Sequence, residues 1–274
     1  MNCKYCGSIK VIRGGTRDNK QKWICKSCGK QFTYGEKRKK QERPLIFNYS
    51  LGYVLGVLAG DASISRWKDY YYFNEKNQHV RKCKATRIVP RFRYGFQLQC
   101  KDKDFAETFA EHLRRVTGKK ATMYPIQSKL VTVIAGNILR KPYVFHGFKV
   151  QSISKEWHDK VIPLMVDNFS WIERMEQKVK IGFLKGFYDS EGGIGIERGV
   201  HTARVTIYLT NKNRKLLLLA KTFLNDMGIN SYIVDRPEIS RLRIRAKHEV
   251  SKFYKAVGFS LERKMKKIGE LLAT

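Results

Sequence analysis

The chain has 274 residues, with 55 Lys and Arg against 24 Asp and Glu, which gives a formal net charge of +31. Apolar residues make up 42% of the sequence, enough for one large domain or two smaller ones, so a wholly disordered chain is excluded. A positive surplus of this size repels itself in a compact fold and indicates a polyanionic partner, with nucleic acid the first candidate and an anionic membrane surface the second.

The membrane alternative finds no support in the sequence. No stretch reaches the roughly 18 uncharged apolar residues that a spanning helix needs. The start of the chain is polar where a signal peptide carries its hydrophobic run. We therefore expect no membrane partner and no secretion, and a reducing compartment that is either the cytoplasm of a prokaryote or an organelle.

Four cysteines lie within the first 28 residues as two C-x2-C pairs separated by 18 residues. Two such pairs predict a closed four-thiolate zinc site, which is structural and not catalytic. Two disulfides are the alternative, and a reducing compartment disfavours them. The predicted zinc ligands are Cys3, Cys6, Cys25 and Cys28. Cys83 and Cys100 lie apart from this group and are interpreted as ordinary small residues.

Residues 1–34 form the predicted zinc ribbon, and residues 35–45 a basic linker. Residues 1–43 hold 13 Lys and Arg against three acids, with few large apolar residues, so metal binding must supply most of the folding free energy. The linker could lie along phosphates or be a plain solvated tether. Residues 1–33 resemble the zinc ribbons at the start of insertion-sequence transposases, which implies a small DNA-binding ribbon. The resemblance is carried by Cys6-Gly7-Ser8, Arg13-Gly14-Gly15-Thr16 and Cys25-Lys26-Ser27-Cys28-Gly29-Lys30-Gln31-Phe32.

The rest of the chain contains a repeat with an offset of 130 residues: Gly52, Gly56, Gly60 and Asp61 correspond to Gly182, Gly186, Ser190 and Glu191. Small residues at every fourth position predict a helix with one bare stripe, along which a second helix can pack closely. Strands are predicted at 64–73, 88–100, 193–198 and 202–210, and further strand pairs near 120–150 and 230–246. The prediction is an α+β fold of two α-β-β-α-β-β-α half-domains, residues 46–170 and 171–274.

The predicted strands alternate polar and apolar side chains, so each has one face for the core and one for a partner. Guanidinium and carboxamide groups on one face suit base edges in a major groove. Exposed strands that are basic only for solubility are the alternative reading. The predicted DNA-binding residues are Arg91, Arg93, Gln97, Gln99, Arg204, Arg241, Arg243 and Arg245.

Asp61 and Glu191 each follow a small-residue stripe, at a helix end where the dipole disfavours a carboxylate by ~0.3–1 kcal/mol. If the stripes pack together, the two acids converge. Carboxylates beside the carbonyls of a helix end form an oxygen cage for Mg²⁺ or Mn²⁺. Such ions support phosphodiester hydrolysis.

Two segments, Val54–Ala62 (VLGVLAGDA) and Leu184–Gly192 (LKGFYDSEG), resemble the two motifs of a single-chain LAGLIDADG homing endonuclease, and the resemblance covers residues 46–274. Ala62 departs from it, because the motif usually closes with glycine. The resemblance implies two saddle-shaped antiparallel sheets, related by a pseudo-twofold axis, over the major groove of DNA. It also implies a metal-dependent double-strand break with 3′ overhangs at a long, asymmetric target.

By position, the resemblance makes Asp61, Glu191 and the carbonyls of Gly60 and Ser190 the metal ligands. Further candidates for catalysis are Gln97, Gln99, Asn211 and Lys264. The alternatives are an intron RNA maturase, whose partner is intron RNA, and a non-cleaving DNA-binding regulator. We expect a monomer, encoded by an intron or another mobile element. An intein is disfavoured because no splicing domain is evident and the chain runs from Met1 to Glu-Leu-Leu-Ala-Thr.

Overall fold

The computed structural model describes residues 1–17, 20–33, 43–75, 86–130, 133–134, 137–138, 143–198 and 203–273. The chain forms two compact units, Met1–Pro44 and Leu45–Thr274, and each is described by itself. Most of the expected linker and Cys83 lie outside the described residues. Within these ranges, no helix combines the length and apolar character needed to cross a bilayer.

The first unit is a three-stranded antiparallel sheet in the order β1-β2-β3. The strands are β1 (Val11–Arg17), β2 (Lys20–Cys25) and β3 (Gln31–Thr33). Among the residues of this unit that the structure describes, the buried apolar core consists of Cys3, Cys25 and Phe32. So small a core cannot offset the entropy of ordering the chain, which fits the expectation that a bound ion holds this unit together.

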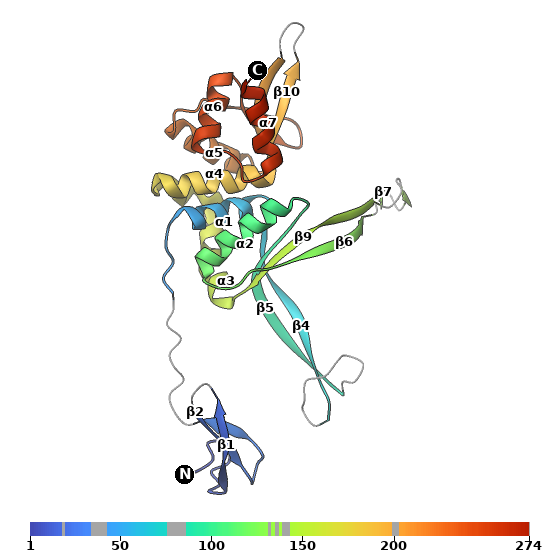
Figure 1. The fold of residues 1–274 in the computed structure, drawn as a ribbon, viewed down its shortest axis with the longest axis vertical. Helices are drawn as coiled ribbons and strands as arrows, with labels where there is room; N and C mark the ends of the chain where they lie inside the picture. The colour runs from blue at the N-terminus through green and yellow to red at the C-terminus, as the bar shows by residue number, and fades with distance from the viewer. Residues whose placement is uncertain are drawn as a thin grey trace. The chain divides into compact units, whose positions relative to one another are not determined.

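The second unit repeats one series of elements, shown in Figure 1. The first half comprises α1 (Tyr49–Ala59), β4 (Ser63–Phe73), β5 (Arg87–Cys100), α2 (Lys103–Thr117), β6 (Thr122–Leu130), β7 (Val133–Ile134), β8 (Asn137–Ile138), β9 (Tyr143–Ile153) and α3 (Lys155–Val161). A 3-10 segment, η2 (Ile162–Arg174), follows. The second half comprises α4 (Gln177–Glu191), β10 (Gly192–Arg198), β11 (Ala203–Asn211), α5 (Arg214–Asp226), β12 (Tyr232–Val234), β13 (Ser240–Ile244), α6 (Lys247–Ala256) and α7 (Glu262–Ala273).

The two main sheets have the same topology. Their orders are β4-β5-β9-β6 and β10-β11-β13-β12, so in each sheet the strands stand in the order first, second, fourth, third. All pairings within them are antiparallel. The predicted fold of two α-β-β-α-β-β-α halves is therefore confirmed, with α7 and the small β7–β8 pair as additions that the sequence did not predict.

Helices α1 and α4 lie side by side at the centre of the second unit (Figure 1), and their backbones touch along the predicted stripes. A Cβ atom added to Gly52 would overlap the carbonyl oxygen of Val179, and one added to Gly182 would overlap that of Tyr49. Each helix thus presses its bare stripe against the other helix's backbone. A side chain larger than hydrogen does not fit at these positions, which is why glycine stands there.

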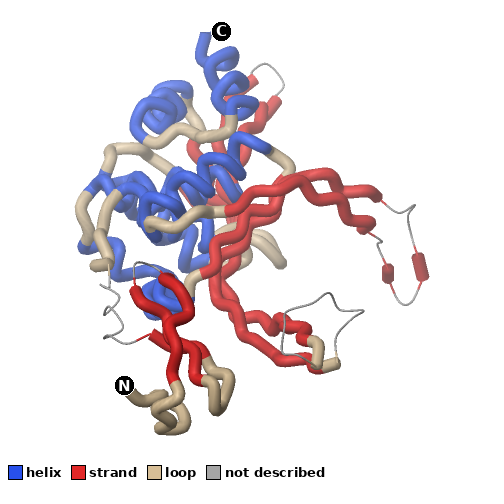
Figure 2. Tube along the Cα trace, turned by 60° about the horizontal axis from the view of Figure 1, so that its bottom comes forward, coloured by secondary structure: helices blue, strands red, loops and turns tan. Residues whose placement is uncertain are grey.

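The core lies between the sheets and the helices. Figure 2 shows the helices of the second unit gathered together, with the strand pairs β4–β5 and β6–β9 extending away from them. Phe96 and Leu98 of β5 are buried in the core, whereas Phe92 is 46% exposed. The alternation along β5 puts all three on one face of the strand. The outer half of β5 leaves the core because β5 pairs with β9 only from Gly95 to Cys100.

Candidate functional site

The ends of α1 and α4 meet, and each bears one of the predicted acids. Gly60 caps α1 and precedes Asp61, while Glu191 is the last residue of α4. A Cβ atom on Gly60 would lie 2.5 Å from Cβ of Ser190 and 3.0 Å from Cγ of Glu191. The two helix ends are therefore in direct contact, and both acids emerge from that contact.

The electrostatics of this point favour a cation. Loss of surrounding water raises the pKa of Glu191 above its ordinary value, and the charge of Asp61 raises it further. The pKa of Asp61 is also raised by loss of water, and the nearby Lys264 lowers it in part. Each carboxylate is thus costly to ionise here, and an added positive ion would relieve that cost. Hard oxygen donors of this kind fit Mg²⁺ or Mn²⁺.

Lys264 of α7 is buried beneath the end of α4, with 6% of its surface exposed. Its Nζ donates hydrogen bonds to the carbonyl oxygens of Tyr188 (3.0 Å) and Asp189 (2.9 Å). Both carbonyls lie in the last turn of α4, where the carbonyl of Tyr188 also accepts from the backbone N–H of Gly192. Burial lowers the pKa of Lys264 to about 8. Lys264 thus binds the carbonyls of the two residues that directly precede Ser190, whose own carbonyl is one of the predicted metal ligands.

Asp189 is a buried acid that the sequence analysis did not single out. Its carboxylate accepts hydrogen bonds from the Tyr53 hydroxyl (2.8 Å) and from the backbone N–H of Ser260 (2.8 Å). Burial raises its pKa, and these two donors oppose the rise. Asp189 therefore ties α4 both to α1 and to the segment that leads into α7. The signal in the sequence was an acid inside an otherwise buried helical turn.

Helix α7 also binds the first half of the unit. Arg263 donates to both carboxylate oxygens of Asp102, at 2.7 and 2.9 Å, and the N–H of Glu262 donates to Asp104 (2.7 Å). The guanidinium of Arg263 lowers the pKa of Asp102. Asp104 thereby satisfies a free N–H at the start of α7 and suits the positive end of its dipole. The last helix thus spans both halves beside the paired acids.

A cavity of about 650 Å³ opens next to Asp61. Its lining includes Asp61, Gln99, Asp102, Tyr208, Arg263 and Lys264. Two of the further catalytic candidates, Gln99 and Lys264, are thus brought to one space with Asp61. Gln97 lies on the same face of β5 as Gln99, two residues farther from the acids.

Asn211 is placed elsewhere. It shares the face of β11 with buried Leu209, and its Oδ1 accepts from the backbone N–H of Asn213 (2.8 Å), where it helps to start α5. Because side chains alternate along a strand, the neighbouring Thr210 takes the position on the polar face. A catalytic role for Asn211 stays a prediction.

The predicted DNA-binding residues of β5 and β13 lie on the sheet faces that point away from the core. Arg93 forms an ion pair with Asp69, Nη2 to Oδ2 2.6 Å, and the Arg91 guanidinium lies 5.0 Å from the centre of the Tyr71 ring. On β13, Arg241 and Arg243 alternate with the buried Leu242 and Ile244, so they share the polar face, and Arg245 comes directly after the end of the strand. Arg204 pairs with Glu197 in the β-ladder, and its side chain lies outside the description.

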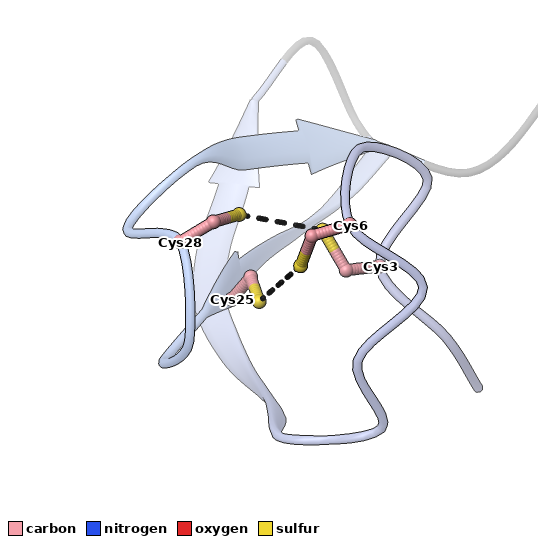
Figure 3. Close-up of side chains that lie close together, drawn as sticks. All are labelled: Cys3, Cys6, Cys25 and Cys28. Atoms are coloured by element: carbon pink, nitrogen blue, oxygen red, sulfur yellow. Dashed lines mark hydrogen bonds between the residues drawn. The ribbon is translucent and has the colours of Figure 1, made fainter.

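The four cysteines of the first unit converge, as Figure 3 shows. The sulfur atoms of Cys3 and Cys28 are 3.7 Å apart, those of Cys6 and Cys25 are 3.6 Å apart, and all four lie within 4.8 Å of one another. A disulfide needs about 2.05 Å. Four sulfurs at about 2.3 Å from one zinc ion would lie ~3.8 Å apart, so the residues fit a tetrahedral zinc site.

The turns that carry these cysteines are alike. Gly7 and Gly29 have positive φ angles of 71° and 67°, and their N–H groups donate to the carbonyls of Cys3 and Cys25. Backbone N–H groups of Cys28 and Ser27 lower the pKa of Cys25 to about 6, which favours its thiolate. Both knuckles thus aim sulfur at the same point.

Comparison with known proteins yields a family match and several relatives. Residues 178–258 match the model of the LAGLIDADG-like domain. Two uncharacterised proteins of Methanocaldococcus jannaschii are 29% identical over 184 residues and 23% identical over 239 residues. These matches cover 66% and 81% of this chain and 55% and 71% of the relatives. A DNA polymerase of Thermococcus sp. strain GE8 is 27% identical over 132 residues, 46% of this chain and 7% of the polymerase. The chain thus spans about half the length of the first relative and a small part of the polymerase.

Among solved structures, the homing endonuclease I-WcaI bound to its DNA recognition sequence matches with a TM-score of 0.52 at 15% identity, covering 84% of this chain and 89% of that one. I-DmoI in complex with DNA and Ca matches with a TM-score of 0.48 at 17% identity, covering 81% and 99%. Residues 178–258 therefore carry a LAGLIDADG-like domain, and the second unit has the fold of the LAGLIDADG homing endonucleases.

Proposed function

We propose that this protein is a site-specific, metal-dependent DNA endonuclease. One observation carries the proposal: the bare stripes of α1 and α4 bring Asp61 and Glu191 to a single point. The polar faces of two sheets with the same topology flank that point. A structural role alone gives no reason to place two acids there, since each raises its own folding cost.

In this proposal Asp61, Glu191 and the carbonyls of Gly60 and Ser190 hold Mg²⁺ or Mn²⁺. The bound ion would supply an activated water and stabilise charge on the oxygens of the scissile phosphodiester. Lys264 holds the preceding carbonyls of α4 in place and offsets part of the negative charge. Gln99, at the rim of the cavity, orients groups on the DNA or its water by hydrogen bonding.

The finer features of the proposal follow from the family resemblance and the residues on the sheets. A monomer binds a long, asymmetric duplex in the major groove and makes a double-strand break with 3′ overhangs, as an intron-encoded homing endonuclease does. We place the half-domain boundary between residues 170 and 171 and the basic linker at residues 35–45. The first unit binds a structural Zn²⁺ and adds contacts to DNA phosphates through its lysines and arginines.

The test starts from a random duplex library, from which cleaved sites are selected in the presence of Mg²⁺. Asp61→Asn and Glu191→Gln should each abolish cleavage of a selected site and leave its binding largely unchanged, because only the metal ligands are altered. Glu107→Gln is the matched control: this acid is exposed on α2 and paired with Lys103, so both activities should persist. Undiminished cleavage by either site variant, or loss of binding by both, would count against the assignment.

A further inference from the structure

The polar face of the N-terminal sheet is lined by amides next to the acids. Ser63, the second residue after Asp61, pairs with Gln97, and Gln97 pairs on its other side with Gln151. One row nearer the acids, Gln99 pairs with Lys149. The rows closest to the candidate active site in this half thus carry three glutamines and one lysine.

The equivalent rows of the C-terminal sheet carry arginines. Gly193, the second residue after Glu191, pairs with Tyr208, and Tyr208 pairs on its other side with Arg243. One row nearer the acids, Thr210 pairs with Arg241. Because the two sheets share their topology, Arg243 corresponds to Gln151 and Arg241 to Lys149. Arg245, directly after the end of β13, continues the same alternation.

Arg241 is already held in place on this face. Its guanidinium lies 4.7 Å from the centre of the Tyr208 ring, a favourable cation–π geometry. The ring in turn lies on two glycines of β10: an added Cβ on Gly195 would be 3.5 Å from Cε1, and one on Gly193 only 2.6 Å from Cε2. Ring and guanidinium therefore lie stacked before any ligand binds, which lowers the entropy cost of a contact.

Two buried polar atoms of this face make no hydrogen bond to the residues that the structure describes. Nε of Arg241 and Oγ1 of Thr210 are buried without a hydrogen-bond partner among the residues that the structure describes. Arg93, the inner arginine of β5, is paired through Nη2 with Asp69 on the neighbouring strand, although its Nε also has no partner among the described residues. In the rows nearest the acids, guanidinium groups therefore belong to the C-terminal half and amides to the N-terminal half.

We propose that the two halves of the DNA target differ in base composition in a defined way. The half-site under the C-terminal sheet has guanines, bound by Arg241, Arg243 and Arg245, because arginine matches the O6 and N7 acceptors of guanine. The half-site under the N-terminal sheet has adenines at the inner positions, bound by Gln97 and Gln151. This inference rests on the proposed function and deepens it.

The spacing of the guanines follows from strand geometry. Side chains on one face of a strand recur every ~6.7 Å, and base pairs rise ~3.4 Å, so successive arginines meet every second base pair. We expect guanine at alternate base pairs, three in all, within the half-site of the C-terminal sheet.

The experiment sequences duplexes from a random library that the full-length protein binds at fixed salt. The expected result is alternating guanine in one half-site and adenine at inner positions of the other. Arg241→Lys keeps the charge and loses the fork, so it should relax one guanine preference about tenfold or more. Gln151→Ala should relax a preference in the opposite half only. Arg114→Lys, exposed on α2, is the control and should change no preference.

Each outcome separates this inference from the proposed function. Selected sites with the same composition in both halves would overturn the inference while leaving DNA binding intact. So would an Arg241→Lys variant that weakens binding equally for all sequences, since that result means phosphate contacts. Thermal unfolding of each variant shows whether it is folded. Failure of the wild-type protein to enrich any duplex would instead remove the proposed function itself.

Discussion

Replacing Gly56 with alanine should separate the two central helices. A Cβ atom at this position would lie 2.8 Å from the backbone N of Phe187 and 2.9 Å from the carbonyl C of Phe183, and closer still to the Phe183 oxygen. Ordinary contacts between such atoms are about 3.5–4.0 Å, so α1 and α4 would have to move apart by roughly 1 Å. Neither partner can rotate away, because both are backbone atoms.

The magnitude follows from two opposing effects. Alanine stabilises a helix interior by up to ~1 kcal/mol relative to glycine, whereas overpacking costs ~1–3 kcal/mol or more. The backbone clash belongs at the upper end, which leaves a net loss of about 2 kcal/mol in the free energy of unfolding. That loss leaves most molecules folded. Moving the paired acids by about 1 Å should nevertheless lower cleavage ~100-fold.

Urea unfolding and single-turnover cleavage of a selected duplex measure the two effects. Gly269→Ala is the matched control, because Gly269 lies within α7 and an added Cβ would meet nothing within 4 Å. This control should gain up to ~1 kcal/mol of stability and cut normally. A Gly56→Ala protein that is as stable and as active as the wild type would refute the close-packing argument.

Four further predictions concern other parts of the molecule. Burial lowers the pKa of His112 to about 4, whereas the same side chain in the unfolded chain has a pKa near 6.5. Between these values the unfolded chain binds a proton that the folded chain does not. The free energy of unfolding should therefore fall by up to about 3 kcal/mol as the pH drops from about 6.5 towards 4. His112→Gln should flatten this slope in urea titrations, and an equally steep slope would contradict the assignment. Chelation of zinc, or Cys25→Ser, should unfold the first unit without lowering the melting temperature of the second unit. Deletion of residues 1–43 should remove about four phosphate contacts and so reduce the slope of log K for DNA against log salt concentration by roughly 3–4. Asp102→Asn should lower the free energy of unfolding by about 1 kcal/mol, since the ion pair with Arg263 is partly exposed. A double-mutant cycle with Arg263→Gln should give a coupling energy of that size. Additive losses in the two single variants would mean that the pair contributes nothing.

Features that depend on local periodicity were predictable from the sequence. The stripe through Gly52 and Gly56 and the acid after it can be recognised because a helix repeats every 3.6 residues, whatever it packs against. The alternation in β13 likewise fixed which face carries Arg241. The cysteine spacing was equally informative, since a knuckle turn is local.

Features that depend on distant chain segments could not be predicted. The contact of Lys264 with the end of α4 joins residues more than 70 positions apart, and nothing in the spacing of α7 indicates which helix end it meets. The same holds for Asp189 and its donor Tyr53, 136 positions away.

Along the strands of the two sheets, buried residues that maintain the fold alternate with residues on the polar face. Buried positions such as Leu242 and Ile244 maintain the fold, while the residues between them can change without disturbing it. Under the proposed function, substitutions at every second position of a few strands would therefore change the DNA sequence that is bound while the fold is kept. The glycines between α1 and α4 would stay constant throughout, because any larger side chain there would force the paired acids apart.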